Sequence, residues 1–265
     1  MLDALGVVMV DAMGLGSSVD AHVLGWSHMT SAVDGDRLTV EIAAANRLGM
    51  DEPMLCLTCA DITEFDSQGE AVFIDLMRRP GPGHRPDAPA YGPEHGPESY
   101  DPPLSWALER LHTTGAGWIR LAPGLPDAAL PRLGGAHEAE WISYGGYIQE
   151  AVLWFGVDEQ WTPRPDPVRK ATLLPAGVSL TGRGLPHPAV RAAGRYLYVP
   201  DPAVVYARLL PELAQDLAAG PLEEGGTLLT SDELRPTPFA TAYEIPRTGG
   251  RPGCSSPVPP TAPPC

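Results

Sequence analysis

Four aspartates in the first third of the chain lie where a nucleotide-type ligand would need carboxylates. Each follows a short apolar run of the kind that forms a buried strand, and they are Asp11, Asp34, Asp61 and Asp75. Gly14 and Gly16 follow the first run, where a glycine turn lets a ligand approach the backbone and the next helix N-terminus. Carboxylates at adjacent strand ends can accept hydrogen bonds from ribose hydroxyls. Aspartate is also common at strand ends for turn geometry alone, so a bare turn role stays open for each acid.

The elements that would position these acids alternate between strand and helix. Apolar runs predict strands at residues 7–10, 29–33, 54–59, 71–74 and 118–121. Helices are expected at 19–25 and, from apolar residues at helical spacing, at 38–48. This alternation predicts an α/β fold with a Rossmann-like, doubly wound, mostly parallel sheet. Segments 140–144 and 147–155 flank Gly145-Gly146, which predicts an antiparallel hairpin at the end of that sheet.

The rest of the chain divides into a long loop, a small second region and a proline-rich end. Residues 80–103 hold eight prolines and four glycines, which excludes a core element there. Asp101 is expected to cap a helix that begins at Pro102. Residues 203–217 predict one amphipathic helix, and a domain boundary is expected near Gly182.

Composition excludes several classes of function. The charge balance of 18 − 33 = −15 repels phosphate backbones and anionic lipids, so gross basicity cannot supply affinity for nucleic acid. The sequence has no apolar run long enough to span a membrane and no signal peptide, which predicts a cytoplasmic protein with no membrane partner. Cys56 and Cys59 form a CxxC, but no second ligand pair accompanies them, so we expect buried strand cysteines and no metal site.

Several segments carry a resemblance to a known family. VVMVDAMGLG, AVDGD, CADITEF and VFIDLMRRP, in this order, resemble motifs I to IV of class I S-adenosylmethionine-dependent methyltransferases. Six later segments look like the bacterial members of that class that carry a C-terminal THUMP-like domain; they are YDPPLSW, IRLAPGLP, AEWISYGGYIQEAVLWFG, KATLLPAG, GRYLYVPDPAVVYARLL and LTSDELRPTPFATAYEI. The resemblance runs through nearly all of residues 7 to 245.

The resemblance implies a cofactor and a role for each candidate residue. The cofactor is S-adenosyl-L-methionine. Asp11 and Gly14 to Gly16 would approach its methionine part, Asp34 would hold the ribose, and Asp61 and Ile62 would face the adenine. Asp75 would lie where the substrate meets the methyl group, as the catalytic residue. Asp101-Pro-Pro-Leu104 is similar to the acid-Pro-Pro-aromatic loop of amino-group methyltransferases, although the helix-cap interpretation is favoured because Leu104 replaces the aromatic residue.

The resemblance also implies an organisation and a partner. It divides the chain into a methyltransferase-like domain at 1–182, an incomplete THUMP-like domain at 183–245 and a disordered proline-rich tail at 246–265, with the family pattern truncated at both ends. RNA as a partner is implied by family analogy alone. The leading hypothesis is therefore a methyltransferase acting on RNA. A non-catalytic binding or structural protein with the same fold, and another nucleotide-binding α/β enzyme, remain alternatives.

Overall fold

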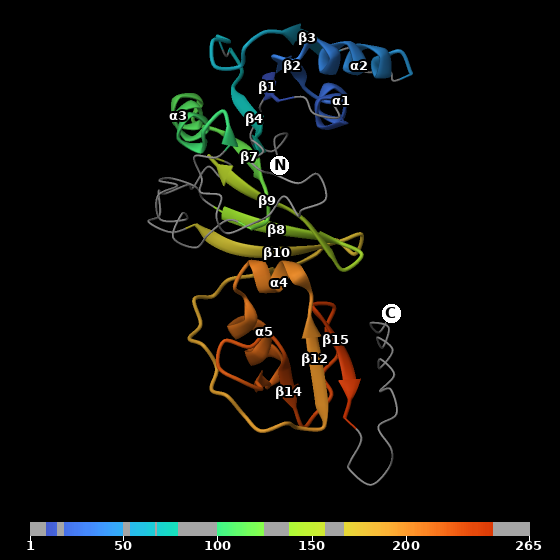
Figure 1. Cartoon of the computed structure of the whole chain (residues 1–265), viewed down its shortest axis with the longest axis vertical. Helices are drawn as coiled ribbons and strands as arrows, with labels where there is room; N and C mark the ends of the chain where they lie inside the picture. Colours follow the sequence, from blue (N-terminus) through green and yellow to red (C-terminus); the bar gives the residue numbers. More distant parts are fainter. Residues whose placement is uncertain are drawn as a thin grey trace, which may run out of the picture. The chain divides into compact units, whose positions relative to one another are not determined.

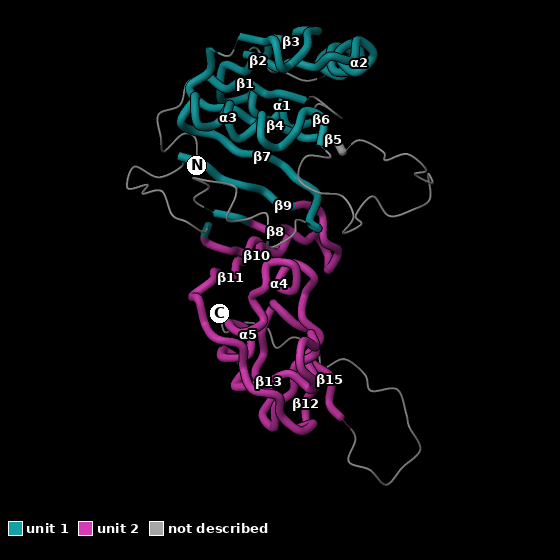
Figure 2. Tube along the Cα trace, turned by 60° about the vertical axis from the view of Figure 1, so that its left-hand side comes forward, with its two compact units in different colours: residues 1–139, 151–167 teal, residues 140–150, 168–265 magenta. Residues whose placement is uncertain are grey.

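A computed structural model describes residues 9–14, 19–49, 54–66, 68–78, 100–124, 138–156 and 167–245. The chain folds into two compact units (Figure 2). Unit 1 comprises residues 1–139 and 151–167, and unit 2 comprises residues 140–150 and 168–265. The domain boundary expected near Gly182, the THUMP-like domain and the truncation at both ends stay predictions. The proline-rich tail at 246–265 lies outside the described residues.

Strands and helices alternate through the first half of the chain, as Figure 1 shows in blue to green. In chain order the elements up to the hairpin are β1 (Met9–Met13), α1 (Val19–Gly25), β2 (Met29–Asp34), α2 (Arg37–Arg47), β3 (Leu55–Cys59), β4 (Ala71–Asp75), β5 (Met77–Arg78), β6 (Tyr100–Asp101), α3 (Leu104–Thr114), β7 (Gly117–Leu121), β8 (Glu138–Tyr144) and β9 (Tyr147–Phe155). β1 pairs in parallel with β2 and β4, β2 with β3, and β4 with β7.

The strand order of the large sheet is β11-β10-β8-β9-β7-β4-β1-β2-β3, with β9 antiparallel to β7. The Rossmann-like α/β class with a mostly parallel arrangement and an antiparallel continuation is therefore confirmed. The hairpin is not the end of the sheet, because β10 and β11, which were not expected as strands, follow it in the order. Their antiparallel pairing is set by the turn at residues 175–177, where Gly177 has a φ of +66°.

The core of unit 1 explains why these strands are apolar along their whole length. Val10, Ala12 and Met13 of β1 are almost fully buried, as are the first four residues of β4, because helices cover both faces of a parallel sheet. α1 and α2 pack on one face through Ala21 and Ala43. α3 packs against β4 and β7, on the other side of the sheet in Figure 1.

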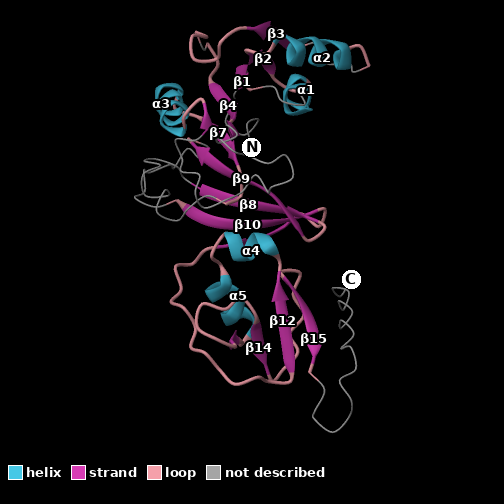
Figure 3. Cartoon of the chain, viewed as in Figure 1, coloured by secondary structure: helices cyan, strands magenta, loops and turns pink. Residues whose placement is uncertain are grey.

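The described residues of unit 2 contain a small antiparallel sheet and two short helices (Figure 3). Its elements after the hairpin are β10 (Val168–Leu174), β11 (Val178–Thr181), β12 (Tyr196–Pro200), α4 (Pro202–Tyr206), α5 (Leu210–Leu217), β13 (Gly220–Pro221), β14 (Leu229–Ser231) and β15 (Ala240–Glu244). The sheet order is β13-β14-β12-β15, and its pairs are antiparallel.

Three expectations about local structure were wrong. The single helix expected at 203–217 is two helices, because Arg208 adopts a φ of +60° and Pro211 starts a new helix. Asp101 does not cap α3: the N-cap is Pro103, and no side chain caps it. Cys56 and Cys59 are exposed rather than buried, because β3 is the outer strand of its sheet.

Among the described residues, none of the helices is both long and apolar enough to cross a membrane.

Candidate functional site

The register of the parallel strands brings three of the expected residues to one edge of the sheet. Met13, the last residue of β1, pairs with Val33 of β2 and with Ile74 of β4. The next residue of each segment is therefore level with its neighbours, and these residues are Gly14, Asp34 and Asp75. Because β2 and β3 pair to their ends, Asp61 follows two residues past the same edge.

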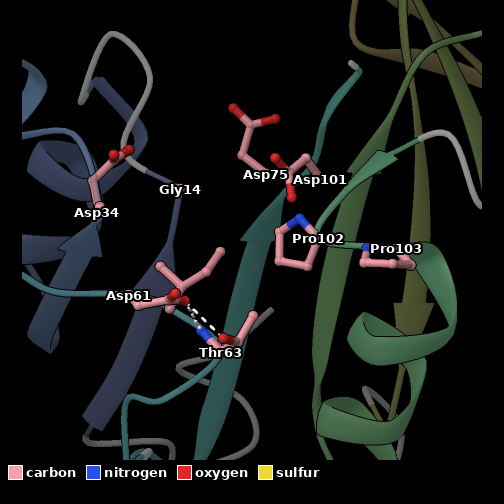
Figure 4. Close-up of a pocket in the computed structure, with 10 residues that line it drawn as sticks. Gly14, Asp34, Asp61, Thr63, Asp75, Asp101, Pro102 and Pro103 are labelled. Atoms are coloured by element: carbon pink, nitrogen blue, oxygen red, sulfur yellow. Dashed lines mark hydrogen bonds between the residues drawn. The ribbon is translucent and has the colours of Figure 1, made fainter.

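A pocket of about 600 Å³ opens at this edge, as Figure 4 shows. Its lining residues are Gly14, Asp34, Gly35, Asp61, Ile62, Thr63, Asp75, Asp101, Pro102 and Pro103. In Figure 4, Asp34 and Asp61 lie on one side of the pocket, and Asp75, Asp101 and the two prolines lie on the other. The volume falls within the range of small-molecule sites, about 300–1,000 Å³.

Gly14 is required at the floor of this pocket. Its φ of +82° lies in the region that side chains disfavour, and its N–H donates to the carbonyl of Val33 at 3.0 Å. A Cβ at this position would lie 2.5 Å from the carbonyl oxygen of Asp75. Because a Cβ–oxygen contact under 3.0 Å cannot be accommodated by backbone atoms, the turn from β1 can pass β4 only with glycine here.

Asp34 and Asp61 each organise the turn that follows their strand. Asp34 Oδ1 accepts a hydrogen bond from the N–H of Asp36 at 2.8 Å, and Asp36 in turn caps α2. Asp61 Oδ1 accepts from the hydroxyl of Thr63 at 2.7 Å and from its N–H at 2.8 Å. These hydrogen bonds hold the pKa of Asp61 below its ordinary value, so the carboxylate is charged at neutral pH. Both acids therefore have the turn role that the sequence left open. The same hydrogen bonds hold their carboxylates in place at the pocket.

Asp75 is held by a contact that the sequence analysis missed. The register of β4 and β7 places Arg120 opposite Asp75, and Arg120 Nη1 donates to Asp75 Oδ2 at 3.1 Å. The same nitrogen lies 2.8 Å from Asp20 Oδ2 on α1, and the guanidinium lies 5.5 Å from the ring centroid of Phe73. Burial raises the pKa of Asp75, and the charge of Arg120 acts against that rise. Arg120 therefore links two strands and a helix beside the pocket.

Asp101, Pro102 and Pro103 form a pocket wall that the sequence analysis assigned to a helix cap. The short pair β5–β6 sets Asp101 opposite Met77, two residues after Asp75 in the chain. The proline-rich segment between them gives no sequence signal for this proximity, because loop length alone does not fix where a loop returns. The Pro-Pro dipeptide after an acid was the sequence feature that indicated a place for this segment in the pocket.

Not every expected residue reaches the pocket. Asp11 lies within β1, is fully buried and accepts a hydrogen bond from the N–H of Gly69 at 2.8 Å through Oδ2; it is not among the lining residues. Gly16 lies outside the described residues. The structure thus brings together Gly14, Asp34, Asp61, Ile62 and Asp75. The described residues contain no group of three or more His, Cys, Asp or Glu side chains that could hold a metal ion.

Comparison with solved structures defines the fold. The crystal structure of a candidate methyltransferase from Porphyromonas gingivalis W83 matches with a TM-score of 0.69 at 17% identity. The match covers 91% of this chain and 61% of that one. The chain therefore has the Rossmann-like methyltransferase fold, which confirms the fold that the sequence resemblance implied.

Comparison with curated proteins gives two relatives. The chain is 30% identical over 206 residues to an uncharacterised S-adenosylmethionine-dependent methyltransferase of Mycobacterium tuberculosis, in strains CDC 1551 / Oshkosh and ATCC 25618 / H37Rv. The aligned part is 78% of this chain and 53% of the relative, so the chain spans about half the length of the curated relatives it matches. No family model matches the sequence.

Proposed function

We propose that unit 1 binds S-adenosylmethionine in the pocket lined by Gly14, Asp34 and Asp61 and uses it to methylate an acceptor. The observation that carries the proposal is the level alignment of these residues at the carboxyl edge of parallel strands, where open α/β sheets bind their ligands. The description of the M. tuberculosis relatives as S-adenosylmethionine-dependent methyltransferases supports it.

The pocket residues fit the chemistry of this cofactor. Its ribose hydroxyls are hydrogen-bond donors, and Asp34 offers a carboxylate that can accept from them. Ile62 offers an apolar surface to the adenine. None of the described lining residues is Lys, Arg or His. Asp75 is paired with Arg120, and the carboxylates of Asp34, Asp61 and Asp101 give the pocket a negative field that favours a cationic sulfonium.

The roles of the remaining residues follow from their positions. When bound, the cofactor supplies an electrophilic methyl group. Gly14 keeps the pocket floor free of side-chain atoms, and Asp75 and Asp101 supply carboxylates on the opposite wall, toward the acceptor. Asp75 is the proposed catalytic residue: its carboxylate accepts a hydrogen bond from the acceptor, or as a base the proton that the acceptor loses on methyl transfer, and so keeps the acceptor in line with the methyl group.

The binding step can be tested by calorimetric titration of the full chain with S-adenosylmethionine. The proposal predicts saturable binding, with a loss of about tenfold to a hundredfold in affinity for Asp34→Ala, because one charge-assisted hydrogen bond is worth about 1.5–3 kcal/mol. Glu41→Gln is the matched control, since Glu41 is an exposed acid on α2 that pairs with Arg37 at 2.9 Å, outside the pocket. Unchanged affinity in Asp34→Ala, or binding of NAD in preference, would contradict the assignment.

RNA is the proposed acceptor, and its support is the resemblance of the back half of the chain to methyltransferases with a THUMP-like domain. Methyl transfer from radiolabelled cofactor to total bacterial RNA tests it, with Asp75→Asn as the inactive variant.

The alternative of a binding protein without transfer is favoured by one contact, the ion pair in which Arg120 neutralises Asp75. Binding without transfer to RNA, protein or small amines would favour that alternative.

A further inference from the structure

The guanidinium of Arg120 contacts two carboxylates beside the pocket through a single nitrogen. Arg120 Nη1 lies 3.1 Å from Asp75 Oδ2 and 2.8 Å from Asp20 Oδ2. Asp75 is the last residue of β4, Asp20 is in the first turn of α1, and Arg120 is in β7. Asp75 lines the pocket, whereas neither Arg120 nor Asp20 is among its lining residues. Of these three side chains, Asp75 is therefore the one that a ligand in the pocket would contact.

The contact with Arg120 occupies one oxygen of Asp75. Arg120 Nη1 donates to Oδ2, and within the described part of the chain Oδ1 accepts no hydrogen bond. A carboxylate accepts through both oxygens, so Oδ1 keeps its capacity to accept from a donor in the pocket. The terminal torsion of an aspartate is broad when nothing holds the carboxylate, and the bond to Oδ2 restricts it. Arg120 therefore determines which oxygen of Asp75 is offered to a ligand.

Arg120 is held by packing as well as by charge. The register of β4 and β7 sets its backbone opposite that of Asp75, and its guanidinium lies 5.5 Å from the ring centroid of Phe73. A cation over an aromatic face is attracted by the ring. The Phe73 ring is itself stacked on Trp118, with centroids 5.2 Å apart. The place of the guanidinium is therefore fixed by the sheet and its aromatic side chains, in addition to its bonds to the two acids.

The surroundings of Asp75 act on its charge in opposite directions. Burial raises the pKa of Asp75, the charge and the hydrogen bond of Arg120 on β7 lower it, and the charge of Asp20 on α1 raises it. The other charged residues that line the pocket, on β2, on the loop after β3 and on β6, are Asp34, Asp61 and Asp101. Loss of Arg120 and loss of Asp20 break the same network of ion pairs, yet they should change the pKa of Asp75 in opposite directions.

We propose that Arg120 is a positioning residue for methyl transfer: it holds Asp75 by Oδ2 and presents Oδ1 to the acceptor, while Asp20 competes for the same guanidinium. The inference rests on the function proposed for unit 1. The acceptor gains the methyl group through its own lone pair, the electron pair of the broken carbon–sulfur bond stays on sulfur, and the proton that the acceptor loses passes to Oδ1. Because Arg120 stays bonded to Oδ2, the carboxylate keeps its place as the proton arrives.

An NMR titration of the full chain without cofactor tests the hold on Asp75. The carboxyl carbons of the aspartates are labelled, and the signal that is missing in Asp75→Asn identifies Asp75. The pKa of Asp75 should rise in Arg120→Gln and fall in Asp20→Asn. Glu41→Gln is the control, because Glu41 is an exposed acid of α2 that pairs with Arg37, and it should leave the titration unchanged. A merely structural effect would move both network variants the same way, so shifts in one direction, or none, would overturn the proposal.

The pH profile of methyl transfer tests the positioning itself. Arg120→Gln should lower kcat about tenfold to a hundredfold, the effect of one charge-assisted hydrogen bond, while calorimetry shows the affinity for S-adenosylmethionine nearly unchanged, because Arg120 does not line the pocket. The pH of half-maximal rate should rise in Arg120→Gln and fall in Asp20→Asn, and Arg120→Lys, which keeps the charge, should recover part of kcat.

An unchanged kcat and pH profile in Arg120→Gln would overturn the proposal. If the unmodified chain transfers no methyl group, the function proposed for unit 1 fails, and the titration without cofactor then decides separately whether Arg120 holds Asp75.

Discussion

At the scale of single residues, substitutions at Gly14 and Gly115 distinguish the cost of a left-handed backbone from the cost of a steric clash. Gly14 and Gly115 both have positive φ, but a Cβ at Gly115 would meet nothing within 4 Å, whereas at Gly14 it would meet the Asp75 carbonyl at 2.5 Å. Both alanine variants bear the left-handed backbone cost of about 1–2 kcal/mol. The free energy of unfolding of Gly14→Ala should fall by about 1–3 kcal/mol more than that of Gly115→Ala, because the new Cβ at Gly14 overpacks against the Asp75 carbonyl. Urea denaturation measures both, and equal losses would contradict the close approach of β1 and β4.

The pair formed by Asp75 and Arg120 predicts a pH dependence. Burial raises the pKa of Asp75 in the folded state, so its contribution to stability is present below the unfolded-state pKa and is lost as pH rises through the raised value. Arg120 opposes this rise, so Arg120→Gln should raise the pKa of Asp75 further. The free energy of unfolding of this variant should therefore fall by about 1–2 kcal/mol more at neutral pH than near pH 4. This amount lies between the contributions of exposed and of buried ion pairs.

Denaturant unfolding across that pH range checks this expectation. The double variant Arg120→Gln with Asp75→Asn is the control, because it removes the titrating carboxyl while it keeps the loss of the contact to Asp20. The pH dependence left in the double variant is that of the lost pair with Asp20, so the difference between the single and the double variant isolates the part due to Asp75. A single variant whose loss varies with pH no more than that of the double variant would show that Arg120 does not set the charge of Asp75.

Sequence reasoning found some of these residues and missed others for a physical reason. Asp34, Asp61 and Asp75 follow apolar runs, and strand ends of a parallel sheet share one edge, so their convergence could be predicted. Arg120 could not, because its pairing with Asp75 depends on the register of two strands 45 residues apart. Asp101 reaches the pocket through a long segment whose path leaves no periodic signal.

At the scale of the elements, helix caps distinguish an acid that stabilises a helix from one that lines the pocket. Asp201 is the N-cap of α4, and its Oδ1 accepts from the N–H of Ala203 at 2.8 Å. Asp201→Ala should lower the free energy of unfolding by about 1 kcal/mol. Asp101→Ala should cost less, because Asp101 is exposed and makes no cap contact with α3. Thermal and urea unfolding compare the two variants, and a larger loss in Asp101→Ala would restore the cap interpretation.

Two elements were described incorrectly from the sequence, because the features that decide their structure are not visible in the local pattern. The continuous helical spacing from 203 to 217 concealed a break, because nothing in a sequence marks Arg208 for a left-handed backbone and only Pro211 announces a new start. The exposure of Cys56 and Cys59 depends on the position of β3 at the outside of its sheet. Local pattern predicts the type of an element, whereas its neighbours decide which faces are buried.

At the scale of the whole molecule, the two units should respond differently to the cofactor. Ligand binding adds protection to amides whose exchange needs an opening that releases the ligand, and a unit that opens independently of the site gains none. Hydrogen exchange of the full chain with S-adenosylmethionine should therefore show added protection at residues 31–38, 58–66 and 72–78 of unit 1. Residues 196–231 of unit 2 should exchange as before, and Asp34→Ala should remove the difference. Uniform protection across both units would contradict a site confined to unit 1.

The central claim is that the carboxyl edge of β1, β2, β3 and β4 holds a sulfonium nucleoside, and a crystal structure of the chain with S-adenosylhomocysteine tests it most directly. The account predicts the ribose hydroxyls within hydrogen-bond distance of the Asp34 carboxylate, the adenine against Ile62 and the sulfur near Gly14 and Asp75. Density for the ligand at any other place, or these residues packed together with no ligand between them at saturating concentration, would contradict it.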